Sequence, residues 1–214
     1  MISQATAKRG KRDRLLRQGA LIEAANAVFA EHGYDGATTR QIAERAGCSE
    51  GLIHRYFSGK RGLLLAILDS KAANIVAEFE SALPDRPTIP EEIEQLLLWH
   101  LDVMWERRDF MRVAVSQATI DPDTGRIIGS GINKRRVDLI VDKLRRHEQA
   151  GHIRRDVDLE AVAHSIAGLG FAIGFVFRVC FDEERELARR ILVGAAQAIS
   201  RGIAPPPAAG TPPR

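Results

Sequence analysis

Residues able to form directional hydrogen bonds and ion pairs are concentrated in one stretch, Thr38–Lys60. Threonine, glycine and serine are typical of helix ends, so the stretch predicts a helix over Thr39–Ala46, a break at residues 47–48 and a second helix after Ser49. The second helix turns a mixed set of side chains away from its apolar side: Glu50, Leu52, His54, Arg55 and Tyr56. These groups suit recognition of a partner.

Such short helices cannot stand alone in water, so other elements must hold them. A preceding helix from about Asp13 to Glu31, ending at Gly33, has apolar residues three and four positions apart on one face. Three helices with these faces can enclose a small core, which we expect to contain Phe29, Ile42, Ile53 and Phe57. The arrangement predicts a helix-turn-helix, whose second helix is sized for the major groove of DNA.

Composition favours an all-α protein. Of the 214 residues, 45% are hydrophobic and 28% charged, and Ala, Leu, Glu and Arg recur throughout. The net charge is only +3, but residues 8–17 hold six basic side chains against one acid, a cluster that attracts polyanions. A solvated basic tail is an equally good explanation of that cluster alone.

Several patterns bear on location and cofactors. Cys48 and Cys180 lie in apolar helical contexts without metal-ligand spacing, and we expect reduced structural thiols, no metal and no cofactor. The N-terminus lacks the apolar region of a secretory signal. The apolar run Ile166–Val179 is expected to be too short to cross a bilayer. A cytoplasmic protein without a membrane partner is predicted.

The last two helices suggest self-association. Asp158 is expected to cap a helix with an apolar stripe and a second stripe of small residues, and Asp182 a final helix. Small residues permit close approach of another helix, either within the monomer or from a second copy. We favour a two-fold four-helix dimer interface, because proteins that bind the major groove usually pair. Its predicted residues are Ala163, Ala167, Gly170, Gly174, Ile191 and Ala195.

About forty residues, from Ala24 to Leu63, resemble the TetR/AcrR family of bacterial transcriptional regulators. The matching positions keep the family's spacing throughout: Ala24, Ala25, Phe29, Gly33, Tyr34, Thr38, Thr39, Ile42, Ala43, Ala46, Gly47, Ser49, Gly51, Ile53, Phe57, Lys60 and Leu63. Cys48, His54 and Gly59 depart from the family's usual residues. The His54 departure bears on sequence preference and leaves DNA binding itself unaffected.

The resemblance implies that the second helix enters the major groove and that Lys60 contacts a phosphate. The DNA-contacting residues expected on this basis are Thr38, Thr39, Arg40, Glu50, Gly51, Leu52, His54, Arg55, Tyr56 and Lys60. It also implies an effector pocket in the C-terminal helices, although each proposed lining residue is also explained by core packing. The lining residues proposed are Trp99, His100, Met104, Trp105, Phe110, Met111, Gln117, Phe171 and Phe175.

Four segments are predicted: a flexible basic arm at 1–12, a three-helix DNA-binding domain at 13–60, a ligand-binding and dimerisation domain at 61–203, and a disordered proline-rich tail at 204–214. The expected function is that of a homodimeric repressor released from double-stranded operator DNA by a small-molecule effector. A regulator controlled by a protein partner and an activator are alternatives. An all-helical enzyme is disfavoured, because the sequence shows no nucleophile–base pair, phosphate loop or paired carboxylates.

Overall fold

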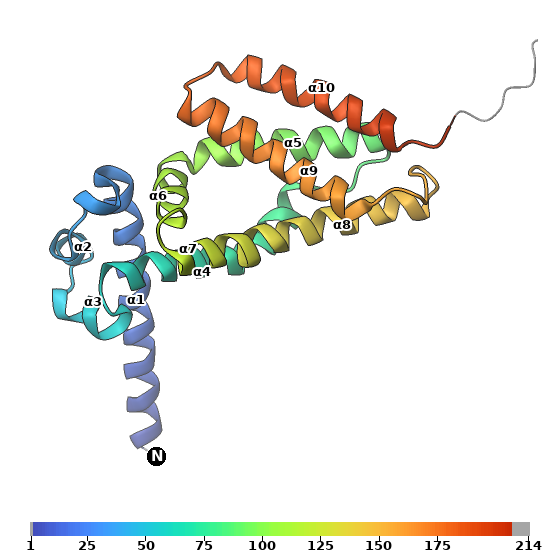
Figure 1. Ribbon diagram of the computed structural model, residues 1–214. Helices are drawn as coiled ribbons and strands as arrows, with labels where there is room; N and C mark the ends of the chain where they lie inside the picture. The colour runs from blue at the N-terminus through green and yellow to red at the C-terminus, as the bar shows by residue number, and fades with distance from the viewer. Residues whose placement is uncertain (1, 207–214) are drawn as a thin grey trace, which may run out of the picture. The chain divides into compact units, whose positions relative to one another are not determined.

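The computed structural model describes residues 2–206, and this part of the chain contains helices and no strands (Figure 1). The all-α prediction is therefore confirmed. The predicted tail at 204–214 falls mostly outside the described residues. The helices are α1 (Ile2–Gly36), α2 (Thr39–Arg45), α3 (Glu50–Phe57), α4 (Lys60–Ala82), α5 (Ile89–Glu106), α6 (Arg108–Ala118), α7 (Pro122–Arg126), η1 (Ile127–Asn133), α8 (Lys134–Gln149), α9 (Leu159–Phe171), η2 (Ala172–Cys180) and α10 (Arg185–Ile203).

Two helix starts differ from the predictions. Residues 2–12, expected to be a flexible arm, continue α1 as helix, since Gly10 lowers helix stability by only about 1 kcal/mol and no proline intervenes. The final helix starts after Glu184, because Asp182, the predicted cap, takes a left-handed conformation with φ of +57°. The predicted Asp158 cap is confirmed: its carboxylate accepts a hydrogen bond from the amide of Ala161 at 3.0 Å.

Contacts divide the chain into two compact units. The first contains residues 1–73 and 109–131, and the second contains residues 74–108 and 132–214. Helix α4 begins in the first unit and ends in the second. The two units divide the chain inside α4, not after Lys60, so the functional boundary expected there stays a prediction.

The first unit is organised around the core that the apolar faces predict. Phe29, Ile42 and Ile53 are fully buried, whereas Phe57 is only half-buried. Leucines of α1 and α4 and further apolar residues complete this core: Leu21, Ala25, Leu63, Leu64, Ile67 and Leu68. Helices α2 and α3 are thereby held by tertiary packing, as their shortness requires.

In the second unit, α5 packs against α9, η2 and α10, and α8 packs against α9 (Figure 1). Its core is aliphatic: Ile93, Leu96, Leu97, Ile140, Leu144, Ile166 and Leu192 are fully buried. The run expected to be too short for a bilayer is part of a continuous 22-residue helix, Leu159–Cys180, with mean hydropathy 1.6. By length and composition it could cross a membrane, but a core helix passes the same test.

Candidate functional site

Side-chain and backbone hydrogen bonds build the junction of α2 and α3. Thr38 starts α2 with a reciprocal cap: its hydroxyl accepts from the backbone amide of Gln41 at 3.2 Å, and the side-chain oxygen Oε1 of Gln41 accepts from the backbone amide of Thr38 at 2.9 Å. Gly47 then has φ of +61°, which glycine adopts without steric cost. Ser49 precedes α3 as expected, but its side chain forms no cap hydrogen bond.

Helix α3 has one inward and one outward side. Ile53 is fully buried, and Leu52 and Tyr56 are half-buried. The predicted contact residues Glu50, Gly51, His54 and Arg55 are all exposed. Because positions four apart lie on the same helix face, Glu50 lies next to His54 and Gly51 next to Arg55. The structure therefore gathers these expected contact residues on one short exposed helix.

Residues at the start of α2 are engaged with acidic neighbours. The hydroxyl of Thr39 donates to the Glu50 carboxylate at 2.5 Å, which ties the start of α2 to the start of α3. Arg40 is exposed and pairs with Glu44 at 2.9 Å, which raises the pKa of its guanidinium. Arg40 can leave this exposed pair at little cost, since such pairs contribute little stability.

Tyr56 is the point where the basic N-terminal segment meets α3. The guanidinium carbon of Arg14 lies 5.3 Å from the centre of the Tyr56 ring, a cation–π contact. The ring of Phe57 also packs edge-on against Tyr56. At least one basic residue of the 8–17 cluster is therefore placed beside the exposed helix.

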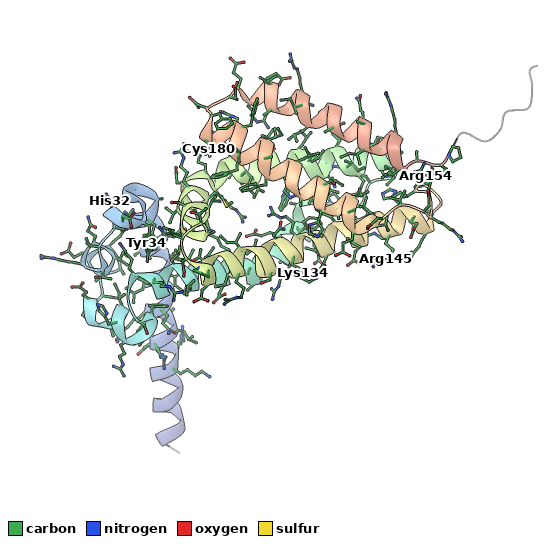
Figure 2. The ribbon with its side chains drawn as sticks, viewed as in Figure 1. His32, Tyr34, Lys134, Arg145, Arg154 and Cys180 are labelled. Carbon is green, nitrogen blue, oxygen red and sulfur yellow. The ribbon has the colours of Figure 1, made fainter. Side chains whose placement is uncertain are left out.

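The ammonium of Lys60 is bonded to backbone carbonyl oxygens of its own chain. Its Nζ donates to the carbonyl oxygens of Tyr34 at 2.7 Å, Ala37 at 3.0 Å and Asp35 at 3.4 Å, and it lies 4.5 Å from the centre of the Tyr34 ring. Figure 2 labels Tyr34 in this region. An ammonium has three protons, so these carbonyls at the end of α1 and after it use its donors. In this structure Lys60 holds the end of α1 and the residue after it, and its expected phosphate contact stays a prediction.

The two residues that follow Lys60, Arg61 and Gly62, were not singled out from the sequence. Arg61 forms ion pairs with Asp121 at 2.9 Å and Asp123 at 2.5 Å, and the bond from Arg61 lowers the pKa of Asp121 to about 2. Gly62 approaches the end of α3 so closely that a side-chain carbon there would lie 1.5 Å from the carbonyl oxygen of Phe57. Neither contact could be predicted from the sequence. The partners of Arg61 lie far away in the chain, and the partner of Gly62 is a backbone atom.

The expected ligand residues fall into two groups, one in each unit. Phe110, Met111 and Gln117 are in the first unit, where Phe110 packs under the Lys71 ammonium at 4.7 Å. The second unit contains the rest: Trp99, His100, Met104, Trp105, Phe171 and Phe175. Within the second unit, Trp99 packs edge-on against His100, and the rings of Phe171 and Phe175 stack at 5.4 Å. Their contact with an effector stays a prediction.

His100 is the most unusual of these residues. It is fully buried, and its Nδ1 lies 2.6 Å from the carbonyl oxygen of Leu96, so Nδ1 carries the proton and donates. Its Nε2 is buried without a hydrogen-bond partner among the described residues. Burial, followed by the nearby charge of Arg136, lowers the pKa of His100 to about 3, so the ring is neutral.

Arg136 was not singled out from the sequence. It is only 7% exposed, and burial, together with the like charge of Arg107, lowers its pKa to about 10. The guanidinium remains charged at neutral pH. Burial of Arg136 could not be expected from the sequence, because a charged residue of an amphipathic helix usually lies on its exposed face.

The small-residue stripe is buried in the second unit. Ala163, Ala167, Gly170 and Gly174 are buried inside the second unit, and a side-chain carbon at Gly170 would lie 2.6 Å from Cβ and Cγ of His100. The stripe thus allows α9 and η2 to approach α5 of the same chain, as in the alternative of packing within the monomer, and the predicted dimer interface stays a prediction. Of the other two predicted interface residues, Ile191 is exposed and Ala195 half-buried on α10.

A pocket of about 610 Å³ lies in the second unit, away from the expected ligand residues. It is lined mainly by residues 87–90, 151–152 and 197–205, and none of the predicted lining residues contributes to it. Within residues 2–206, no group of three or more His, Cys, Asp and Glu side chains could hold a metal ion. His147 is buried, and its Nε2 lies 3.5 Å from the Glu92 carboxylate.

Comparison with known proteins gives consistent results for sequence and structure. Residues 21–67 match the family model described as "Bacterial regulatory proteins, tetR family". The chain is 29% identical over 182 residues to the HTH-type transcriptional repressor AcnR of Corynebacterium diphtheriae, which covers 83% of this chain and 88% of that protein. It is 30% identical over 149 residues to the HTH-type transcriptional repressor Rv1474c of Mycobacterium tuberculosis, covering 66% and 71%.

Among solved structures, the chain resembles the transcriptional regulator FadR of Bacillus subtilis in complex with stearoyl-CoA. The TM-score is 0.65 at 20% identity, and the match covers 85% of this chain and 95% of that one. The likeness shows that the order of helices is shared beyond the matched N-terminal segment.

Proposed function

Since the chain belongs to the TetR family of bacterial transcriptional regulators, we propose that it is a homodimeric repressor that a small-molecule effector releases from operator DNA. Two named repressors are its relatives over most of their length. The observation that carries the proposal is α3, a short helix that buries Ile53 and exposes Glu50, His54 and Arg55. A helix of this kind presents hydrogen-bonding groups to base edges and phosphates.

Within this interface, Arg55 is the best candidate for direct contact. Its side chain is exposed, and no hydrogen bond or ion pair holds it among the described residues. It can reach a guanine edge or a phosphate. Tyr56 and Arg14 offer a phenol and a guanidinium on the same side of the unit. Lys60 has a structural role and is left out of the proposed contacts.

Gel retardation with a palindromic fragment from the chain's own promoter tests DNA binding. Arg55→Ala is expected to weaken binding by about 10-fold or more, whereas Arg145→Ala, which removes an exposed arginine of the second unit, leaves it unchanged. Raising salt from about 50 to 200 mM is expected to lower affinity steeply, because phosphate contacts release counterions. Salt-independent binding, or no binding, would refute the proposal.

A second copy is proposed to pack on the outer face of α9, η2 and α10. This face exposes small and apolar residues, named here the outer face: Ala161, Gly168, Ala172, Ile191, Gly194 and Ala198. The inner sides of these helices are occupied by α5 of the same chain. Ile191→Glu would place a charge on this surface. We expect it to convert a dimer to a monomer in sedimentation, while an unchanged dimer would exclude this face.

Release is proposed to act through α4. This helix begins at Lys60, directly after α3, and its last residues belong to the second unit. A ligand that prefers one orientation of α4 would change the separation of the two α3 helices in a dimer, whereas equal affinity for both states shifts nothing. The support is the likeness to a regulator bound to stearoyl-CoA.

A further inference from the structure

Among the described residues of the second unit, Arg136 is a buried cation without a counter-charge. Arg136 is 7% exposed and lies in the first turn of α8, next to the buried Val137. Within residues 2–206 no ion pair or hydrogen bond reaches its guanidinium, and its Nε is completely shielded. Burial of an unpaired charge is costly. The protein has an arginine here, although an uncharged methionine or leucine at this position would avoid the loss of stability.

A second buried cation on the same helix is paired with carboxylates. Lys143, two turns further along α8, is 4% exposed, and its ammonium lies 3.0 Å from the Glu92 carboxylate and 2.9 Å from that of Asp85. Arg107, whose charge acts on Arg136, is likewise paired, with Glu78 at 2.7 Å. Arg136 therefore differs from its cationic neighbours in having no carboxylate of its own.

A second unpartnered group lies within electrostatic reach of Arg136. The neutral His100 donates from Nδ1 to Leu96, so its buried Nε2 presents a lone pair that accepts no hydrogen bond from the described residues. The ring cannot turn away easily, because Gly170 lies against its Cβ and Cγ. The guanidinium of Arg136 and the Nε2 of His100 are thus both buried in the second unit without a hydrogen-bond partner among the described residues.

We propose that the effector is an organic acid with an apolar body, whose carboxylate or phosphate binds Arg136 and whose hydrogen-bond donor, such as a hydroxyl, meets Nε2 of His100. The proposal deepens the proposed function and rests on it for the role of the ligand. A charge-assisted bond to the guanidinium replaces the missing counter-ion. The buried Met104 and Phe175 and the half-buried Trp99 supply apolar surroundings in the same unit.

The test compares wild type with Arg136→Met, Arg136→Lys and the matched control Arg145→Met, which removes an exposed arginine from the same helix (Figure 2). Ligand-free Arg136→Met is expected to melt at the same or a higher temperature than wild type, because an unpaired buried charge is lost. Arg145→Met is expected to melt like wild type. A large drop in the melting temperature of Arg136→Met would show that Arg136 is structurally required and would overturn the inference.

Binding is then measured by calorimetry with four probes of equal chain length: decanoate, 3-hydroxydecanoate, decyl phosphate and 1-decanol. Wild type is expected to bind an acid at least about 10-fold more tightly than the alcohol, and Arg136→Met to lose that preference. Arg136→Lys keeps part of the preference, and Arg145→Met keeps all of it. The carboxylate and phosphate probes show which acid is preferred, and the hydroxylated acid tests the contact with His100.

Equal affinity for decanol and the acids, unchanged acid binding by Arg136→Met, or no acid binding would each overturn the inference. DNA binding of the ligand-free protein is measured separately, by gel retardation. Failure there would remove the proposed function, whatever the acids do. Acid binding that is lost in Arg136→Met would still establish the anion site, so the two failures are distinguishable.

Discussion

Arg136 and His100 of the second unit differ from the polar groups around α2 and α3 in their partners. Around α2 and α3, Lys60 meets three carbonyl oxygens, Thr39 meets Glu50, and Arg61 meets two aspartates. In the core of the second unit, by contrast, Arg136 and the Nε2 of His100 have no partner among the described residues. Burying such groups unpaired lowers stability, whereas the bonds of the first unit add to it.

If Arg136 and His100 bind the effector as proposed, the difference separates a DNA-contacting surface that must be rigid from an interior that must respond to a ligand. A helix that contacts DNA works best when its orientation is fixed before binding, since ordering it later lowers affinity. An effector site, however, needs groups whose interactions are completed only by the ligand. Stability lost at a functional site in this way is common in proteins. Four substitutions test the contrast.

The largest effect is expected from Gly62→Ala. A side-chain carbon would lie 1.5 Å from the carbonyl oxygen of Phe57, so α3 and α4 must separate. We expect a loss of about 3 kcal/mol or more in the free energy of unfolding, together with loss of DNA binding. Gly19→Ala, where nothing lies within 4 Å, is the control. A stable Gly62→Ala protein that binds DNA would show that this junction is not rigid.

The corresponding change in the second unit is Gly170→Ala. The new carbon would meet the His100 side chain at 2.6 Å, and we expect a loss of about 1–3 kcal/mol in thermal unfolding. Gly202→Ala on α10, where nothing lies within 4 Å of the added carbon, is expected to change stability by about 1 kcal/mol or less, in the stabilising direction. Equal effects of the two changes would mean that α9 does not pack tightly on α5.

Lys60→Met separates a structural role from a DNA contact. Three carbonyl oxygens would lose their donor, and we expect a loss of about 1–3 kcal/mol in stability by chemical denaturation. Arg40→Ala, at an exposed ion pair, should change stability by less than about 0.5 kcal/mol. A Lys60→Met protein of normal stability but weakened, less salt-dependent DNA binding would restore the phosphate contact.

The smallest effect concerns Asp121 and Arg61. The pKa of Asp121 is about 2 in the folded protein, below its ordinary 3.8, so the interaction stabilises the fold above pH 4 and is lost as pH falls through about 2. Asp121→Asn should therefore lower stability at pH 7, and its difference from wild type should shrink between pH 4 and 2. Acid unfolding followed by circular dichroism measures this. A constant difference would mean that Arg61 does not shift this carboxylate.

Much of the first unit could be predicted from local signals. The cap at Thr38, the turn at Gly47 and the buried Ile53 each follow from residue type and spacing, and all three are confirmed. The role of Lys60 could not be predicted, because its carbonyl partners belong to residues 34–37, more than twenty positions earlier in the chain. The family's motif specifies a lysine at position 60, but it does not specify which atoms the ammonium contacts.

The sequence by itself determined the class of fold, the positions of α2 and α3 and the membership of a family of DNA-binding regulators, because periodicity, caps and motif spacing are local properties. Only the tertiary structure decided that the small residues of α9 and η2 face α5 of the same chain, and that Arg136 is buried without a counter-charge. The sequence does not show which element a stripe of small residues packs against, or whether a charged side chain has a partner. Burial and pairing depend on which distant helices pack together.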